Sequence, residues 1–384
     1  MKRARSLAGL FLIIIFPFLL VTHYWITDRN AVLRAIYPLQ AYVSEVTIDC
    51  SPGAPDWLGS IVEHGIWGLR SLSTQVVFID IDGNVDNCES GWEDGSLFKK
   101  VDKDSKFYYG SLTKPITAAA LMILNKESKI SYDDNVYGYL NVEEKASSDY
   151  KLPYITVDDL MKHRSWIVGN IFNLNKASWC PYAVVNPDNY RFNGHGSKDT
   201  KYSNLGYCLL GEVLANQMSS DYRKSIDRIL NLEGRGIEFA NAWNHKGTVQ
   251  ADFRYNDFYG NLNPPSFDYY AISSSAGLVG SAYDYALLVR DLLEMDLDGF
   301  FSEKAVECDD SRLRSCYGRA FYVYRCIDGQ VYNIKEGYMP GYSGVVVINS
   351  RKEIFVWLGN SDTNNAANGV AMEKFIAALS GNGF

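Results

Sequence analysis

A serine and a lysine stand three residues apart in the segment Gly110-Ser111-Leu112-Thr113-Lys114. A helix that continues through Pro115 must begin within about one turn before it, because proline has no N–H to donate inside a helix. Residues three apart share one face of a helix, so the Lys114 amine can reach the Ser111 hydroxyl. The unpaired N–H groups of a helix start also favour a developing negative charge. This spacing predicts a nucleophilic serine with a lysine beside it.

The protonation state of Lys114 decides whether this pair can react. A serine hydroxyl is a weak nucleophile without a base, and a lysine is a base only when burial and neighbouring positive charge lower its pKa enough to leave it neutral. A Ser-x-x-Lys spacing occurs often by chance, and taken alone it is more typical of an exposed serine and lysine on a helix. The elements around the pair must therefore decide between the two interpretations.

The elements expected around the pair are strands towards both ends of the chain, with helices between them. A β-branched run reaches an Asp-Gly turn in STQVVFIDIDGNVD and predicts a strand that enters a hairpin. Near the C-terminus, GRAFYVYRCIDGQVYNIKEG, GVVVIN and EIFVWLGN predict successive antiparallel strands, and AANGVAMEKFIAAL predicts a final helix. Because region 130–300 contains mainly short helical stretches, we expect an α+β fold in which an all-α part interrupts a sheet domain.

Several segments resemble, in the same order, those of the class C β-lactamases and related serine esterases. They are FYYGSLTKPITAAALMILNKESKISYDDNVYGYL, ITVDDLMKHRS with Trp166 in the place of the usual glycine, KYSNLGYCLLGEVL with its Tyr-x-Asn element, SSSAGLVGSAYDYALLVRDLL, YGRAF and KEGYMPGYSGVVVIN. On these motifs, residues 57–384 are identified as a member of the serine β-lactamase and penicillin-binding-protein-like superfamily, of the class C β-lactamase, serine esterase and D-aminopeptidase type. The resemblance implies a β-lactamase-like α/β/α sandwich with a central antiparallel sheet, an all-α lobe and the active site between them.

The resemblance also implies a role for each residue that matches a family motif. Ser111 is expected to be the nucleophile that forms an acyl-enzyme, with Lys114 and Tyr202 sharing the proton transfers. Asn204 is expected to position Lys114 and a substrate amide. The backbone N–H groups of Ser111 and Tyr338 are expected to form the oxyanion hole.

Tyr202 has a physical argument of its own. A phenol has an unperturbed pKa near 10 and can act as a base when cations surround it. Lys114 and Lys335 are the expected source of this positive charge. The alternative is a core tyrosine with a hydrogen-bonded hydroxyl.

The third family motif departs from its usual form, because this chain has Lys335-Glu336-Gly337 where Lys-Thr-Gly or His-x-Gly is common. The threonine of that motif helps to receive a substrate carboxylate. A glutamate there would repel the carboxylate, at a cost of a few kcal/mol or about a hundredfold in binding. We therefore expect a substrate that lacks a free carboxylate at that end or carries an amine, such as an ester or an aminoacyl group. The alternative is that Glu336 points away or pairs with Lys335.

The N-terminus predicts a membrane anchor. Basic residues at positions 2, 3 and 5 precede an uncharged, apolar stretch at 7–26, which is near the length of about 20 residues that a membrane-spanning helix needs. A cleaved signal peptide is the alternative, although no A-x-A-like site follows. We expect an anchor at 1–30, a linker at 31–56, and a single pass through the inner (cytoplasmic) membrane with the catalytic domain extracytoplasmic, in the periplasm.

Charge and cysteine content limit the partners. A net charge of −8, with no basic run beyond the N-terminus, argues against nucleic acid. No C-x-x-C pair occurs and the histidines at 64, 163, 195 and 245 form no ligand set, so neither a metal nor another cofactor is indicated, and these histidines are expected to be structural or exposed. The seven cysteines favour disulfides, with a local bridge among Cys308, Cys316 and Cys326. Buried free thiols are the alternative, and the oligomeric state stays open.

These expectations combine into one function and its alternatives. The first is a membrane-tethered serine hydrolase that acts through an acyl-enzyme on an ester or amide, either a small molecule or cell-envelope material. β-Lactamase and DD-carboxypeptidase activities are alternatives within the same class. A non-catalytic, penicillin-binding-like regulatory protein is the alternative outside it, and a missing G-x-S-x-G motif disfavours an α/β-hydrolase.

Overall fold

The computed structural model describes residues 16–140, 154–165, 167, 200–242, 245–255, 268–302, 308–326, 329–361 and 369–384. Within these residues, seven strands form one antiparallel sheet in the order β1-β3-β2-β10-β9-β8-β7. A smaller sheet has the order β4-β6-β5. Trp166, which stands where the family has glycine, lies outside the described residues, as does His195.

The helices and strands have the following bounds. The helices are α2 (Phe16–Thr27), α3 (Arg29–Glu45), α4 (Asp56–Trp67), α5 (Thr113–Lys126), α6 (Val157–Met161), α8 (Asn204–Gln217), α9 (Tyr222–Leu230), α10 (Ser273–Ala276), α11 (Ala282–Glu294) and α13 (Val370–Gly381), with 3₁₀ turns η2 (Gly110–Leu112), η3 (Val136–Gly138) and η6 (Glu233–Arg235). The strands are β1 (Asp49–Cys50), β2 (Thr74–Ile79), β3 (Val85–Ser90), β4 (Phe107–Tyr108), β5 (Glu238–Phe239), β6 (Leu278–Gly280), β7 (Tyr322–Arg325), β8 (Val331–Met339), β9 (Tyr342–Ile348) and β10 (Ile354–Gly359).

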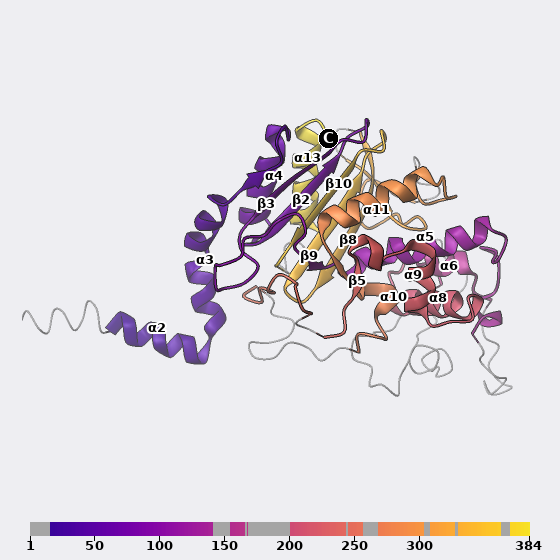
Figure 1. Cartoon of the computed structure of the whole chain (residues 1–384), viewed down its shortest axis with the longest axis horizontal. Coiled ribbons are helices and arrows are strands. Elements are labelled where there is room, and N and C mark those ends of the chain that lie inside the picture. Colours follow the sequence, from indigo (N-terminus) through magenta and orange to yellow (C-terminus); the bar gives the residue numbers. More distant parts are fainter. Residues whose placement is uncertain are drawn as a thin grey trace, which may run out of the picture.

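Both faces of the large sheet are covered by helices (Figure 1). Successive side chains of a strand point to opposite faces, and β2 shows the consequence. Val77 and Ile79 pack into the core cluster beneath α5 and α11, whereas Val76 packs into a second cluster beneath α4 and α13. A strand that is buried on both faces needs apolar residues at nearly every position, which explains the largely apolar sequences of β2, β9 and β10. The predicted α+β architecture with a central antiparallel sheet is confirmed.

Helices α5, α6, α8, α9 and α10 gather beside the β8 and β9 end of the sheet and form the all-α lobe (Figure 1). The helix predicted to begin near Ser111 is present. Ser111 itself lies in the 3₁₀ turn η2, and the α-helix α5 begins two residues later, at Thr113. Eleven of the residues of α5 are buried, so this helix runs through the core of the lobe. Its first turn consequently places Lys114 inside the protein.

At the N-terminal side, α2 projects away from the rest of the molecule in Figure 1. Its apolar side chains are exposed, among them Phe18, Leu19 and Ile26. Of the part of the chain that the structure describes, no helix has both the length and the apolar character required to cross a bilayer. The first residues of the predicted anchor, 1–15, lie outside that part.

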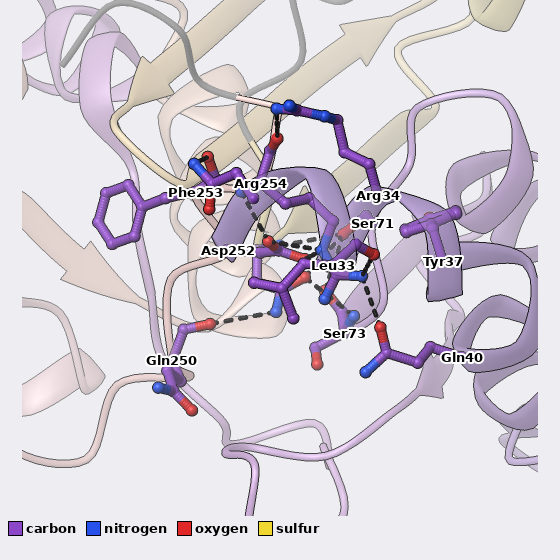
Figure 2. A network of polar contacts seen from close by, with 12 residues as sticks. Leu33, Arg34, Tyr37, Gln40, Ser71, Ser73, Gln250, Asp252, Phe253 and Arg254 are labelled. Carbon is purple, nitrogen blue, oxygen red and sulfur yellow. Dashed lines mark hydrogen bonds and ion pairs between the residues drawn. The ribbon is translucent and has the colours of Figure 1, made fainter. Parts of the chain in front are cut away.

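Helix α3 occupies much of the segment predicted to be a linker, and it is docked on the domain (Figure 2). Arg254 is buried between Asp252, to which its Nε donates, and α3, where its Nη1 donates to Leu33 O at 2.9 Å and to Gln40 Oε1 at 2.5 Å. The Tyr37 hydroxyl donates to the Ile66 carbonyl of α4 at 2.5 Å. Buried polar groups that are paired in this way hold α3 in one position.

Two disulfides lie within the described residues. Cys50 and Cys88 join β1 to β3, and Cys308 and Cys316 close the local loop that the sequence predicted. Cys326 is a buried free thiol. The prediction of disulfides is confirmed, and the local bridge excludes Cys326.

Candidate active site

The turn that carries Ser111 lies directly against strand β8. Gly110 has a φ of +52°, and a Cβ at this position would meet the Tyr338 carbonyl oxygen at 2.6 Å. A Cβ on Gly337 would meet the Tyr109 carbonyl oxygen at 2.1 Å. Only glycine fits at either position, because any side chain would force the two backbones apart. The two segments expected to supply the oxyanion donors, Ser111 and Tyr338, are therefore immediate neighbours.

Lys114 meets Ser111 in the interior of the protein. Its Nζ atom lies 3.0 Å from Ser111 Oγ, 2.7 Å from Asn204 Oδ1 and 2.9 Å from the Ser275 carbonyl oxygen. The side chain is completely buried, and burial lowers the pKa of Lys114 well below its ordinary value, with the charge of Lys335 lowering it further. This is the condition under which a lysine can serve as a base.

Asn204 reaches Lys114 because it opens helix α8. The Ser203 side chain caps this helix by accepting the N–H of Gly206 at 3.0 Å, which is the favoured role of serine at a helix start. The cap fixes where α8 begins, and it therefore fixes the position of Asn204 as the first helical residue. The Ser275 carbonyl, which the sequence did not indicate as part of the site, comes from the short helix α10.

Tyr202 precedes the same cap and stands over both lysines. Its side chain hydrogen-bonds Ser111, and its ring centroid lies 4.9 Å from Lys114 Nζ and 5.1 Å from Lys335 Nζ. Tyr202 is 37% exposed overall, yet desolvation of its hydroxyl is the largest cause of a pKa well above the ordinary value, and the nearby Tyr322 adds to it. The hydrogen bond with Ser111 acts in the opposite direction. On balance the pKa of this phenol is raised, which is the reverse of the sequence expectation.

Lys335 projects from β8 to the same side as Ser111. Its Nζ donates to the Glu336 carbonyl oxygen at 2.7 Å and stands 5.6 Å from the centroid of the Tyr322 ring. Burial lowers the pKa of Lys335 to about 7, although the Glu336 carboxylate opposes this shift. The positive charge of Lys335 contributes to the lowered pKa of Lys114, and its Nζ stands over the Tyr202 ring.

The side chain of Glu336 does not enter the site, which corrects the expectation of a repulsive carboxylate there. Glu336 is only 3% exposed and is bound by Arg314, whose Nε and Nη2 lie 2.5 and 2.7 Å from its two oxygens. The Tyr338 hydroxyl donates to it at 2.7 Å. Residues 336 and 338 share one face of β8, and Lys335 occupies the other, because side chains alternate along a strand. Of the two alternatives drawn from the sequence, the side chain points away, and its partner is an arginine rather than Lys335.

Besides Ser275, two further residues near the site were not identified from the sequence. Arg314 lies inside the loop closed by Cys308 and Cys316, and Arg312 nearby would have been an equal candidate, so no sequence signal distinguished it. His163 packs its ring 4.3 Å from that of Tyr202. It falls within a segment that resembles a family motif, but nothing in its spacing connects it with Tyr202.

The fold and the Ser-x-x-Lys site together define a serine hydrolase of the β-lactamase class. The chain belongs to the Beta-lactamase family, whose model matches residues 65–378. This match confirms both the family resemblance and the class of enzyme predicted from the sequence.

Individual relatives are similar along most of the chain. It is 28% identical over 359 residues to "Putative fimbrial assembly protein FimD, serogroup D" of Dichelobacter nodosus, covering 91% of this chain and 90% of the relative. A class C β-lactamase from Rhodobacter sphaeroides has a TM-score of 0.64 at 15% identity, covering 85% of this chain and 100% of that one. D-Amino acid amidase from Ochrobactrum anthropi SV3 in complex with D-phenylalanine has a TM-score of 0.65 at 14% identity, covering 85% and 99%. At these identities the two structures share the fold with this chain.

Proposed function

We propose that this protein hydrolyses an ester or amide through an acyl-enzyme on Ser111. The observation that carries the proposal is the set of partners around Lys114 Nζ. The amide oxygen of Asn204 and the carbonyl of Ser275 can only accept hydrogen bonds. A neutral lysine amine has two N–H groups and one lone pair. With both N–H groups given to these acceptors, the lone pair is left for the Ser111 hydroxyl.

The same partners also suit the ammonium that forms after proton transfer. An ammonium has three N–H donors, and Asn204, Ser275 and the Ser111 oxygen are three acceptors at 2.7 to 3.0 Å. The site therefore supports both protonation states without rearrangement, which is what a general base requires. Because burial and Lys335 lower the Lys114 pKa, the neutral form is available at rest.

The acylation step follows from these positions. As Ser111 Oγ bonds to the substrate carbonyl carbon, its proton passes to Lys114 and the carbonyl oxygen becomes an oxyanion beside the N–H groups of Ser111 and Tyr338. Tyr202 holds its own proton at rest because its pKa is raised, so it donates that proton to the leaving oxygen or nitrogen. The proton held by Lys114 then replaces it. Water releases the acyl group by the reverse sequence of proton transfers.

The substrate class is an ester or amide, either a small molecule or cell-envelope material. Because Glu336 is neutralised by Arg314 on the other face of β8, it gives no reason to exclude a substrate carboxylate. This observation favours β-lactam or DD-peptide recognition as a second candidate. The motif still lacks the threonine hydroxyl that helps to receive a carboxylate in relatives, so esters and aminoacyl compounds remain the first candidates.

We further propose that the enzyme is tethered to the cytoplasmic membrane with its catalytic domain in the periplasm. The support comes from the basic and apolar N-terminal sequence and from the exposed apolar side chains of α2. A relative that is described as a fimbrial assembly protein agrees with a location at the cell envelope. Protease protection of the full-length protein in spheroplasts tests the orientation, and a C-terminus that resists added protease contradicts it.

Labelling with a fluorophosphonate probe tests the catalytic proposal. Full-length protein in detergent should be labelled covalently, and Ser111→Ala should abolish the labelling while its thermal unfolding stays unchanged. Lys114→Met should slow labelling by about 100-fold or more, since a positioned base contributes that much. Folded wild-type protein that takes up no label supports a non-catalytic binding protein instead.

A further inference from the structure

His163 is wrapped by the aromatic rings of the proposed site. It lies just beyond α6, is 1% exposed, and its ring centroid is 4.3 Å from that of Tyr202, 4.5 Å from that of Tyr317 and 5.1 Å from that of Tyr207. A buried histidine that packs against Tyr202 either fills space or fixes the position of Tyr202. Its hydrogen bonds distinguish these roles.

His163 binds the chain on both sides of Tyr202. Its carbonyl oxygen accepts the N–H of Lys201 at 2.8 Å, and its ring Nδ1 accepts the N–H of Ser203 at 3.2 Å. Ser203 is in turn the cap of α8, and Asn204 is the first residue of that helix. One residue thus holds the backbone immediately before and after Tyr202 and, through the cap, the start of the helix that carries Asn204.

We infer that His163 is the positioning residue for Tyr202 and Asn204, an inference that rests on the proposed acyl-enzyme function. The two hydrogen bonds and the ring contact fix the backbone of 201–203, and this fixes the direction in which Tyr202 approaches Ser111. His163 does not touch the reacting atoms itself. It acts on the reaction by holding the residues that do.

The position demands two properties of its residue. The φ of His163 is +55°, in the left-handed region that glycine and asparagine tolerate better than bulky apolar residues. The residue must also present an unprotonated acceptor at its δ position toward the Ser203 N–H. Burial lowers the pKa of His163 well below its ordinary value, and positive charge on Lys114 or Lys335 lowers it further, which keeps Nδ1 free to accept.

Packing alone does not explain the imidazole. With Nδ1 accepting in the neutral ring, the proton is on Nε2, and Nε2 is buried without a hydrogen-bond partner among the residues that the structure describes. A buried donor left unpaired is unfavourable, and an apolar side chain would avoid it. The Nδ1 bond to the backbone beside Tyr202 is the feature that an apolar side chain cannot supply.

A matched pair of variants separates the acceptor from the volume. Asparagine places Oδ1 close to where histidine places Nδ1, and leucine has the same branched shape without an acceptor. Saturation kinetics with p-nitrophenyl acetate should show kcat for His163→Asn within about threefold of wild type, and kcat for His163→Leu reduced by about 10- to 100-fold with little change in KM, because misplaced proton-transfer groups affect the chemical step. Full-length protein in detergent is used throughout.

His163→Gly is the second test variant, in case His163→Leu does not fold. Glycine tolerates the positive φ and keeps the backbone hydrogen bond from Lys201, but it removes Nδ1. It should lose kcat as His163→Leu does, with cooperative thermal unfolding retained. In a Tyr202→Phe background, the loss in kcat caused by His163→Gly should be smaller than in wild type, because residues that act through one another are not additive, and the loss that remains comes from Asn204.

Three results would overturn the inference: equal kcat in wild type and His163→Gly, equal losses in His163→Asn and His163→Leu, or an undiminished His163→Gly loss in the Tyr202→Phe background. Failure of the proposed function has a different signature. In that case Ser111→Ala turns over p-nitrophenyl acetate as fast as wild type, and the inference falls together with the function on which it rests.

Discussion

Arg314 binds both carboxylate oxygens of Glu336, with its Nε 2.5 Å from Oε2 and its Nη2 2.7 Å from Oε1. The arginine comes from the loop closed by Cys308 and Cys316, and the glutamate lies in β8 between Lys335 and Gly337. The neutralised carboxylate lies on the face of β8 that points away from Ser111. We therefore expect the pair to stabilise this edge of the site and to keep the charge of Glu336 from acting on a substrate.

Removal of Arg314 should destabilise the protein. Arg314→Met leaves the buried Glu336 carboxylate without its cation, and breaking such a pair costs about 3 kcal/mol. Urea unfolding measures the loss. The double variant Arg314→Met with Glu336→Gln should recover most of it, because no buried charge then remains unpaired. Equal destabilisation in the single and double variants would show that the arginine acts through packing instead.

The charge of Glu336 should have little effect on anionic substrates. Labelling by a fluorescent penicillin should change by less than about threefold in the double variant Arg314→Met with Glu336→Thr, which removes both charges of the pair and so keeps their sum. Glu336→Thr alone also frees the Arg314 cation, so a gain in that variant alone is attributed to the arginine. A gain of more than about tenfold in the double variant that persists in Arg314→Met with Glu336→Gln, which adds no hydroxyl, would support the repulsion expected from the sequence.

The pH dependence of acylation should report Lys114. A base acts when it is neutral, so the rate rises as pH increases through its pKa in the folded protein. The positive charge of Lys335 lowers that pKa, so Lys335→Met should raise it and move the rising limb to higher pH. The rate of fluorophosphonate labelling, measured between about pH 5 and 10, shows where the acylation rate rises with pH. The matched control is the exposed Lys352, whose substitution by methionine should leave the limb in place; an unmoved limb in Lys335→Met contradicts the coupling.

Gly110→Ala should damage the site more than the fold. An added Cβ meets the Tyr338 carbonyl oxygen at 2.6 Å and also strains the positive φ, so the Ser111 turn and β8 must separate. We expect kcat to fall by about 100-fold, as when an oxyanion donor is lost, together with a loss of about 1–3 kcal/mol in unfolding free energy. Gly83 also has a positive φ but its Cβ would meet open space, so Gly83→Ala controls for backbone strain. Equal activity in the two variants would contradict the proposed role of the contact.

Local spacing was sufficient for the parts of the protein that neighbours along the chain decide. Three residues of separation ahead of Pro115 bring Lys114 to Ser111, because the turns η2 and α5 repeat every three to four residues. The β-branched runs and Asp-Gly turn predicted β2, β9 and β10, because a strand covered on both faces must be apolar throughout. The family motifs identified Tyr202, Asn204 and Lys335 as site residues, but they did not show what these side chains contact.

Tertiary structure alone decided how those residues are charged and held. The pKa of Lys114 depends on its burial and on Lys335, and the position of Tyr202 depends on His163, some forty residues earlier in the chain. The pairing of Glu336 with Arg314 reversed an expectation that was sound for an isolated glutamate. Desolvation and the meeting of charges depend on distances through space, and a sequence specifies these only after the sheet and the all-α lobe have packed together.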